Sequence, residues 1–384
     1  MNILKQKIIE KINEEGPINF ETFMDMALYY PELGYYSSPG KKIGKEGDFY
    51  TSPHLHPIFG AMLARQFLEM WLSIGKPSDF SVIEMGAGAG YLCKDIHDYL
   101  KRPSSNEELN NNKSVFLNSF RYVIVEPFSH FKEKQIKLLG DLKKNITWIT
   151  STDKLAKNIK GCFFSNELFD ALPVHIIEMK KEFREIFVNY NGKKFVEEMA
   201  NLSSEDIAHY IEQYLPDVQQ GYRTEINLKA KECLKNMSAV LSNGFIFTID
   251  YGYSNREYYS EERSQGTLLC YHKHQFHENP YQNIGKQDIT AHVNFSSLKR
   301  WGDEQGLITT GYCPQGTYLT ASGIDEVIVE LYADSPDYLS EISRIKGLIM
   351  PHGMGESHSV MIQYKGKGLP DLRGFSMRNL AINL

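Results

Sequence analysis

Apolar runs and amphipathic stretches alternate along most of the chain, which predicts strands followed by helices. Apolar residues recur at helical spacing at residues 3–13, 20–30 and from Pro57 onward. Beyond residue 77 the pattern predicts buried strands near 82–83 and at 121–126, 145–150, 162–164 and 245–249, with helices at 91–101, 129–139, 205–214, 228–241 and 295–305. This order is typical of an open parallel α/β sheet, which binds ligands beyond the carboxyl ends of its strands.

Several stretches interrupt this alternation. Residues 103–119 are rich in Asn, show no clear period and are predicted to form a surface insertion. Residues 174–188 alternate in hydrophobicity, which predicts a β-hairpin, and residues 256–292 predict a long ordered loop. Nearer the C-terminus the sequence predicts a turn segment at 311–320, strands at 326–332 and 360–364, and a helix at 338–348.

Three glycines at alternate positions, Gly86, Gly88 and Gly90, end the apolar run at 82–83 just before a predicted helix. Glycine lets the backbone turn sharply and approach a ligand more closely than any Cβ would allow. A dinucleotide-binding loop would need its third glycine at position 91, which is Tyr91. A nicotinamide-dependent dehydrogenase is therefore disfavoured. The pattern Glu84-x-Gly-x-Gly-x-Gly instead resembles the first motif of class I S-adenosylmethionine methyltransferases.

Acidic and amide side chains follow three of the predicted strands. Glu126 closes the strand at 121–126, where a carboxylate can accept hydrogen bonds from both hydroxyls of a ribose. The alternative is a solvated acid at a strand end. Asn166, Glu167 and Asp170 follow the strand at 162–164 beside Phe169, and Asp250 follows the strand at 245–249. We expect these side chains at the mouth of one crevice.

Composition narrows the classes of function. The 384 residues carry a net charge of −6, which gives no basic footprint for nucleic acid. No apolar run approaches the roughly 20 residues of a membrane span. The five cysteines are scattered, and His272 and His274 have no acid or cysteine at ligand spacing, so no metal site is expected. The N-terminus lacks the character of a signal or transit peptide, which predicts a cytoplasmic protein.

Eight motifs span nearly the whole chain in order: Gly34-Tyr35-Tyr36, Gly47 to Pro53, Glu84 to Gly90, Glu126, Asn166 to Pro173, Ile249 to Gly252, Gly266-Thr-Leu and Gly285 to Val293. Together they resemble the MidA / NDUFAF7 family of class I S-adenosylmethionine-dependent methyltransferases. The mitochondrial member of that family is a complex I assembly factor that methylates a protein arginine.

The resemblance implies a Rossmann-like methyltransferase sheet and S-adenosylmethionine as cofactor. We expect N-terminal helices and a cofactor lid at residues 1–77, and a methyltransferase domain at 78–384 with insertions at about 174–226 and 253–294. The glycines would hold the aminoacyl arm of the cofactor, Glu84 would orient the loop and Glu126 would bind the ribose. The expected cofactor-binding residues are Gly34, Tyr35, Tyr36, Thr51, Ser52, Pro53, Glu84, Gly86, Gly88, Gly90, Glu126 and Asn166.

The substrate of the resembled family indicates which residues to expect where the methyl acceptor binds. A guanidinium is planar and cationic, so its site should offer carboxylates in bidentate reach and aromatic walls. The expected catalytic residues are Glu167, Asp170, Asp250, Asp288 and His292, although for Asp170 and Asp288 a structural role in loop hydrogen bonding is an equal alternative. The predicted partner is a protein that presents an arginine, and a homodimer stays open. The alternatives are a silent binding or assembly protein on this fold, or a small-molecule methyltransferase.

Overall fold

The structure is a computed structural model that describes residues 2–40 and 52–384. The chain forms two compact units. The first unit contains residues 1–49, 169–233 and 253–297. The second unit contains residues 50–168, 234–252 and 298–384. The N-terminal residues thus group with two later segments of the chain, and the unit that carries the glycine motif is also assembled from three segments.

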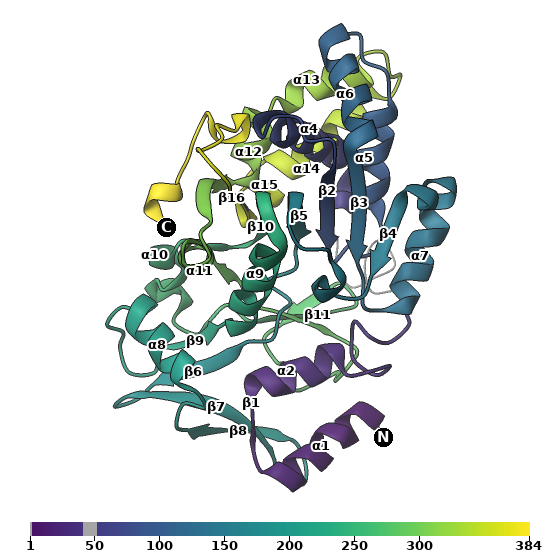
Figure 1. The fold of residues 1–384 in the computed structure, drawn as a ribbon. Helices are drawn as coiled ribbons and strands as arrows, with labels where there is room; N and C mark the ends of the chain where they lie inside the picture. Colours follow the sequence, from purple (N-terminus) through teal and green to yellow (C-terminus); the bar gives the residue numbers. More distant parts are fainter. Residues whose placement is uncertain (1, 41–51) are drawn as a thin grey trace. The chain divides into compact units, whose positions relative to one another are not determined.

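The second unit is built on a sheet in the strand order β15-β16-β10-β5-β2-β3-β4 (Figure 1). The five strands from β10 to β4 are parallel, whereas β16 runs antiparallel to β10 and β15 antiparallel to β16. The strands are β2 (Phe80–Met85), β3 (Phe120–Val125), β4 (Ile146–Ile149), β5 (Ile159–Asn166), β10 (Leu241–Tyr253), β15 (Ile308–Pro314) and β16 (His358–Lys365). This order and direction confirm the predicted Rossmann-like methyltransferase fold.

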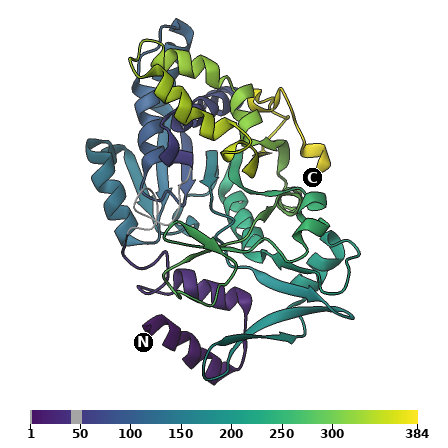
Figure 2. The same ribbon diagram turned by 180° about the vertical axis from the view of Figure 1, so that it is seen from behind.

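Helices bury the apolar side chains of this sheet. The ring of Phe67 on helix α4 lies 5.7 Å from that of Phe164 on β5, and it contacts Phe247 on β10 as well. Helix α4 also packs against α5 and α13 (Figures 1 and 2). The helices are α3 (Ser52–Leu55), α4 (Ile58–Ser73), α5 (Tyr91–Lys101), α6 (Glu107–Ser119), α7 (Ser129–Leu139), α12 (Gln315–Ala321), α13 (Ile324–Tyr332), α14 (Tyr338–Ile349) and α15 (Met354–Ser357), with short 3-10 turns at η1 (Gly140–Asn145), η2 (Thr152–Lys154), η4 (Arg373–Phe375) and η5 (Ala381–Asn383).

The first unit contains two small antiparallel sheets around a separate apolar core. One has the order β1-β7-β6-β9 with β8 beside β7, and the other has the order β12-β11-β13. Helices α1 and α2 pack on the first sheet through Ile8, Phe20 and Phe23, which are fully buried. The strands are β1 (Ile18–Asn19), β6 (His175–Met179), β7 (Phe183–Tyr190), β8 (Phe195–Ala200), β9 (Arg223–Ile226), β11 (Leu269–His272), β12 (Gln275–His277) and β13 (Asp288–Thr290). The short strand β14 (Val293–Asn294) belongs to neither of these two sheets. The helices are α1 (Ile3–Glu15), α2 (Phe20–Tyr29), α8 (Glu205–Tyr214) and α10 (Asn255–Tyr258), with the 3-10 turn η3 (Glu261–Arg263).

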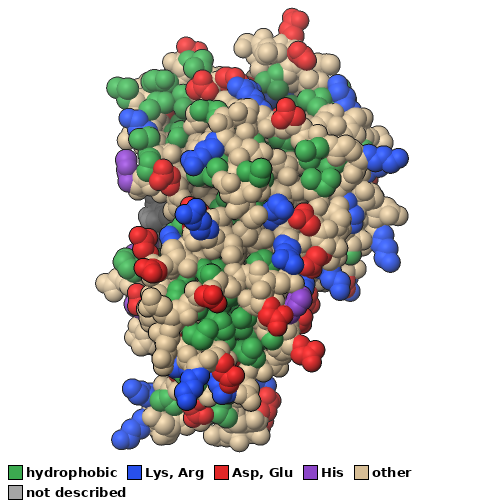
Figure 3. All heavy atoms as spheres, turned by 90° about the vertical axis from the view of Figure 1, so that its left-hand side faces the viewer, with side chains coloured by type: hydrophobic (Ala, Val, Ile, Leu, Met, Phe, Trp, Pro, Cys, Tyr) green, Lys and Arg blue, Asp and Glu red, His purple; other side chains and the backbone are tan. Residues whose placement is uncertain are grey.

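Of the passages of the chain between the units, two lie inside helices, α9 (Leu228–Val240) and α11 (Phe295–Glu304), and one lies near the end of β10. Among the described residues, no helix combines the length and apolarity needed to cross a bilayer. Acidic and basic side chains are interspersed on the face drawn in Figure 3, as a small net charge predicts.

Four local predictions were wrong. Residues 107–119 form α6, because the Asn106 side chain accepts the Leu109 N–H as an N-cap and Phe116 is buried. Residues 324–332 form α13, since Ile324 and Val327 are buried at helical spacing. The predicted loop at 256–292 contains the sheet of β11, β12 and β13, and the predicted turn at 311–320 contains the end of β15 and helix α12.

Candidate active site

The glycine loop joins β2 to α5 in the second unit. All three glycines have left-handed backbone angles, with φ of +72° at Gly86, +52° at Gly88 and +89° at Gly90. Residues with a side chain rarely adopt such angles, so the loop needs glycine for its own path. A Cβ at Gly90 would also lie 3.2 Å from Cγ of Gln135 on α7. The loop is therefore tightly enclosed on the side that faces α7.

Glu126 lies immediately after β3, at the carboxyl edge of the parallel strands. Its side chain is 6% exposed. Oε1 accepts the Phe128 N–H at 3.0 Å, and Oε2 accepts the Gln135 Nε2–H at 2.9 Å. A carboxylate offers about four acceptor positions, so two of them suit further donors. Burial raises the pKa of Glu126 to about 7, against the opposing effect of these two hydrogen bonds.

Glu84 lies within β2, directly before the loop, and is 2% exposed. Its Oε2 accepts the Tyr122 hydroxyl at 2.8 Å. Burial raises the pKa of Glu84 to about 7, with a smaller contribution from the charge of Glu126. The acid predicted to orient the loop is thus held inside the sheet by a tyrosine of β3. Nothing in the sequence indicated that Tyr122 would donate a hydrogen bond to Glu84.

These residues fit S-adenosylmethionine. A ribose needs acceptors for two hydroxyls, which Glu126 offers, and the aminoacyl arm needs close backbone, which the glycines offer. The loop carries no third glycine at Tyr91 for a pyrophosphate.

Asn166, Glu167 and Asp250 lie together in the second unit, where β5 ends beside β10. Ile249 pairs with Asn166, and the Glu167 N–H donates to the Ile249 carbonyl at 2.9 Å. Glu167 has a φ of +53°, a strained value for a residue with a side chain. Its Oε1 accepts Asn166 Nδ2–H at 3.0 Å and lies 3.4 Å from Nε2 of the buried His358. Asp250 is fully buried and accepts the N–H groups of Leu168 and Tyr251.

Asp170, Asp288 and His292 belong to the first unit. Asp288 is 1% exposed, and its Oδ2 accepts the Tyr36 hydroxyl at 2.8 Å. The Tyr36 ring stacks on that of Tyr29, with centroids 5.5 Å apart and planes inclined by 18°. Burial, with the nearby Asp288, holds the pKa of both tyrosines well above the ordinary value. The structure therefore joins a motif of the N-terminal segment to one near residue 288.

His292 is fixed through its backbone. Its N–H donates to Oγ1 of Thr267 at 2.9 Å, and the Thr267 hydroxyl donates to Oε2 of Glu225 at 3.1 Å. A Cβ at Gly266 would lie 2.1 Å from Oε1 of Glu225, which explains the glycine before Thr267. Glu225, on β9, was missed by sequence analysis because no motif contains it.

The remaining predicted residues lie in two places. Gly34 belongs to the first unit, where a Cβ would lie 2.6 Å from the Leu28 carbonyl oxygen, and the neighbouring Tyr35 is fully buried. Ser52 and Pro53 begin α3 in the second unit. The Ser52 hydroxyl is buried and donates to Oε1 of Gln315 at 3.3 Å. Thr51 lies outside the described residues.

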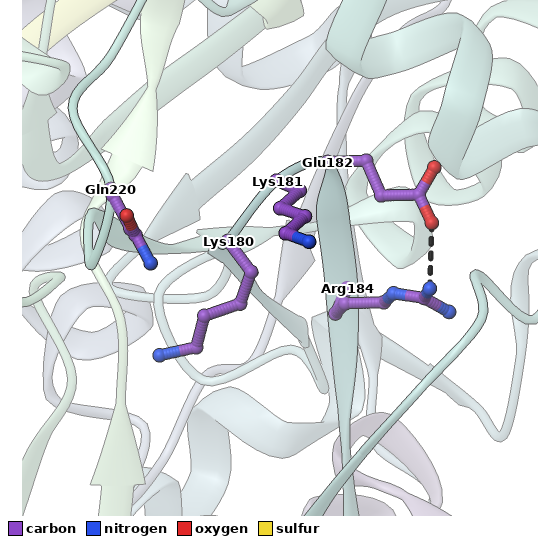
Figure 4. Close-up of a pocket in the computed structure, with 5 residues that line it drawn as sticks. All are labelled: Lys180, Lys181, Glu182, Arg184 and Gln220. Carbon is purple, nitrogen blue, oxygen red and sulfur yellow. Dashed lines mark ion pairs between the residues drawn. The ribbon is translucent and has the colours of Figure 1, made fainter.

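A pocket of about 550 Å³ lies elsewhere in the first unit, at the turn between β6 and β7 (Figure 4). It is lined by Lys180, Lys181, Glu182, Arg184 and Gln220. Glu182 and Arg184 form an ion pair at 2.7 Å across it. None of the predicted site residues lines this pocket, so it has no part in the site described above.

The fold, the glycine loop and the acid after β3 define a class I S-adenosylmethionine-dependent methyltransferase. The profile of a family described as S-adenosyl-L-methionine-dependent methyltransferases matches residues 62–313. The chain belongs to this family, and its cofactor is S-adenosylmethionine.

Curated relatives carry a more specific name. The chain is similar to the mitochondrial protein arginine methyltransferase NDUFAF7 of Rattus norvegicus, with 26% identity over 91% of this chain and 81% of that protein. The corresponding protein of Xenopus tropicalis is 27% identical over 98% of this chain and 90% of its own. The predicted resemblance to the MidA / NDUFAF7 family is confirmed. The prediction of a cytoplasmic protein is contradicted, because these named relatives are mitochondrial.

Solved structures agree with the fold over the full length. A crystal structure of a Burkholderia thailandensis protein bound to S-adenosyl-homocysteine matches with a TM-score of 0.87 and 28% identity, over 100% of this chain and 96% of that one. A native crystal structure of a protein from the same organism matches with a TM-score of 0.85 and 28% identity over the same shares.

Proposed function

We propose that this methyltransferase modifies an arginine side chain of a protein substrate. The relatives named above as protein arginine methyltransferases support the choice of acceptor. At 26–27% identity their names suggest a substrate class for this chain. Further support comes from the chemistry of the motif residues in the first unit.

The observation that carries the proposal is the group formed by Tyr29, Tyr36 and Asp288. The rings of two half-buried tyrosines stack on each other, and the hydroxyl of Tyr36 donates to a buried carboxylate at 2.8 Å. A guanidinium combines a flat cationic face, which stacks on aromatic rings, with N–H donors that pair with carboxylates. This group offers both kinds of contact.

The acids of the second unit have a matching proposed role. Glu167 uses Oε1 for its contacts with Asn166 and His358, and its strained backbone fixes the carboxylate at the end of β5. Within the second unit, we assign Glu167 and Asp250 a role in substrate binding. Within the first unit, we assign Asp170, Asp288 and His292 such a role. His292 would accept the proton that a methylated nitrogen releases.

The bound cofactor supplies a methyl group on a sulfonium, whose sulfur leaves as a neutral thioether. Because the leaving group is neutral, the side chains of the protein mainly align and orient the nucleophile. Glu126 would accept hydrogen bonds from the ribose hydroxyls. The backbone of Gly86, Gly88 and Gly90 would pack against the aminoacyl arm.

The test is the chemical identity of the methylated group. Cell lysate is incubated with S-adenosylmethionine that carries a labelled methyl group, and the labelled proteins are hydrolysed to amino acids. We expect label on methylarginine, and about a hundredfold less with Asp288→Asn, because the cation loses its buried counter-charge. The matched control is Asp217→Asn, an exposed aspartate of the same unit, which should label like wild type. Label on another amino acid or only on small molecules contradicts the proposal.

A further inference from the structure

Gln135 connects the two parts of the cofactor site. It lies on α7, is fully buried, and contacts the glycine loop, the acid that follows β3 and strand β4. Its Nε2 donates to the Gly88 carbonyl at 2.9 Å and to Oε2 of Glu126 at 2.9 Å. Its Oε1 accepts the indole N–H of Trp148 on β4 at 2.8 Å. One side chain therefore bridges the glycine loop and the acid that follows β3.

The orientation of this amide follows from its partners. An indole N–H only donates, so the atom that faces Trp148 must be the amide oxygen. The amide nitrogen then faces the Gly88 carbonyl and the Glu126 carboxylate, which only accept. Both N–H donors of Gln135 are used, and each acceptor belongs to a different wall of the cofactor site. No other assignment of the amide satisfies all three contacts.

We propose that Gln135 is a positioning residue for cofactor binding, which holds the Gly88 carbonyl and the Glu126 carboxylate at a fixed separation. The proposal rests on the proposed contact between Glu126 and the ribose. With Gln135 in place, the Gly88 carbonyl is turned toward α7, and one oxygen of Glu126 is fixed by the amide. Loss of the amide would leave both walls free to move.

The same contact affects the ionisation of Glu126. The hydrogen bond from Gln135 lowers the pKa of Glu126, although burial dominates and raises it to about 7. The other facing groups are the Phe128 N–H and the charge of the neighbouring Glu84. Removal of Gln135 should therefore raise the pKa of Glu126 further and move the pH dependence of cofactor affinity upward. A residue with a purely structural role would leave that midpoint unchanged.

The experiment measures S-adenosyl-homocysteine binding to the full chain by calorimetry from pH 6 to 9. For Gln135→Met, which keeps the length of the side chain, we expect about a 10- to 100-fold weaker affinity and a higher midpoint in pH. The matched control is Gln363→Met, another fully buried glutamine of the same unit, whose amide donates to the Leu298 carbonyl. It should lose thermal stability but keep its affinity within threefold of wild type.

Two further variants keep the test decisive. If Gln135→Met does not fold, Gln135→Glu retains the acceptor for Trp148 and removes the donors, so it should weaken binding at pH 8 by a similar factor. The proposal is overturned if the folded Gln135 variant binds S-adenosyl-homocysteine with wild-type affinity. It is also overturned if Gln363→Met loses as much affinity as the Gln135 variant. Glu126→Ala separates the two hypotheses. Unchanged affinity of Glu126→Ala contradicts the ribose contact. Weaker binding by Glu126→Ala, together with normal binding by the Gln135 variant, contradicts only the role of Gln135.

Discussion

Two buried glutamates show how differently the two units treat a charge. Glu185 in the first unit is completely buried and lies 2.8 Å from Nδ1 of His175, whose Nε2 lies 3.0 Å from Glu21. Glu185 also accepts the N–H and hydroxyl of Ser203. Glu84 in the second unit is almost as buried but accepts only the hydroxyl of Tyr122 among the contacts described. The first acid has a cation and two further donors beside it, and the second has one neutral donor.

The pKa values follow from these partners. Burial lowers the pKa of His175, but the hydrogen bonds that its ring donates to Glu185 and Glu21 outweigh burial and raise the pKa to about 9. Burial raises the pKa of Glu84 to about 7, and the Tyr122 hydrogen bond offsets only part of that. Burial alone therefore does not decide whether an acid is charged. In the first unit the pKa of His175 is raised beside two carboxylates, and in the second unit the pKa of Glu84 is raised to about 7 beside the glycine loop.

The largest expected effect breaks the ionic group of the first unit. Glu185→Ala leaves the His175 imidazolium buried with only Glu21 beside it, and should reduce the free energy of unfolding by about 3–5 kcal/mol. Urea denaturation at pH 7 measures the loss. The control on the same hairpin is Glu182→Ala, whose ion pair with Arg184 is exposed and should contribute little. Equal stability of the two variants would mean that the buried group behaves like the surface pair.

The second prediction is a substitution that should increase the free energy of unfolding. Above pH 7 the folded protein must carry a buried Glu84 carboxylate, whereas the unfolded chain ionises it near pH 4.5. The folded state thus binds the proton more tightly, and stability falls as the pH rises from 4.5 to about 7. Glu84→Gln removes this penalty, so the variant should be more stable than wild type at pH 8 by about 1–3 kcal/mol.

At pH 4.5 the same substitution should have little effect, since Glu84 is then protonated in the folded state and about half protonated in the unfolded chain. Thermal unfolding at the two pH values checks this difference. Destabilisation of similar size at both would show that the Tyr122 hydrogen bond, and not the charge, determines the role of Glu84.

The sequence predicted most of the alternating strands and helices of the second unit, but it failed at segments that depart from this alternation. Helices at 91–101 and 129–139 were predicted at the residues where α5 and α7 are found, because their apolar spacing is clear. The prediction of a strand in the region of α13 failed because Val327 and Val329 alternate with other residues as in a strand. In the structure Val329 is exposed, and Val327 is buried at helical spacing from Ile324. Short apolar segments do not distinguish the two periods.

The position of each acid at a strand end could be predicted, but its partners could not. Glu126 and Asn166 follow strands whose ends the sequence marks. Gln135 lies within an amphipathic helix, and its role depends on the approach of α7 to the glycine loop, which no local pattern encodes. The link between Tyr36 and Asp288 joins residues 252 positions apart for the same reason.

The third prediction concerns the cofactor side alone. If the ribose binds the ionised form of Glu126, with its pKa of about 7, affinity falls as this group is protonated. Between pH 8 and pH 6 the affinity for S-adenosyl-homocysteine should fall about tenfold. Glu126→Gln should bind more weakly at pH 8 and show a nearly flat profile. A wild-type profile that is flat from pH 6 to 8 would contradict a role for the carboxylate.

The smallest expected effect tests the first unit at Tyr29. Its hydroxyl donates to the Ala171 carbonyl at 2.9 Å, and its ring stacks on Tyr36. Tyr29→Phe removes only the hydrogen bond and should cost about 1 kcal/mol of stability, with the stacked ring retained. Cofactor affinity by calorimetry should stay within twofold of wild type, because Glu126 and the glycine loop belong to the other unit. Tyr29→Leu removes the ring as well, so a loss of arginine methylation in this variant, but not in Tyr29→Phe, would assign the aromatic face to the substrate. Equal methylation by both variants would remove the stacked rings from the proposed arginine site.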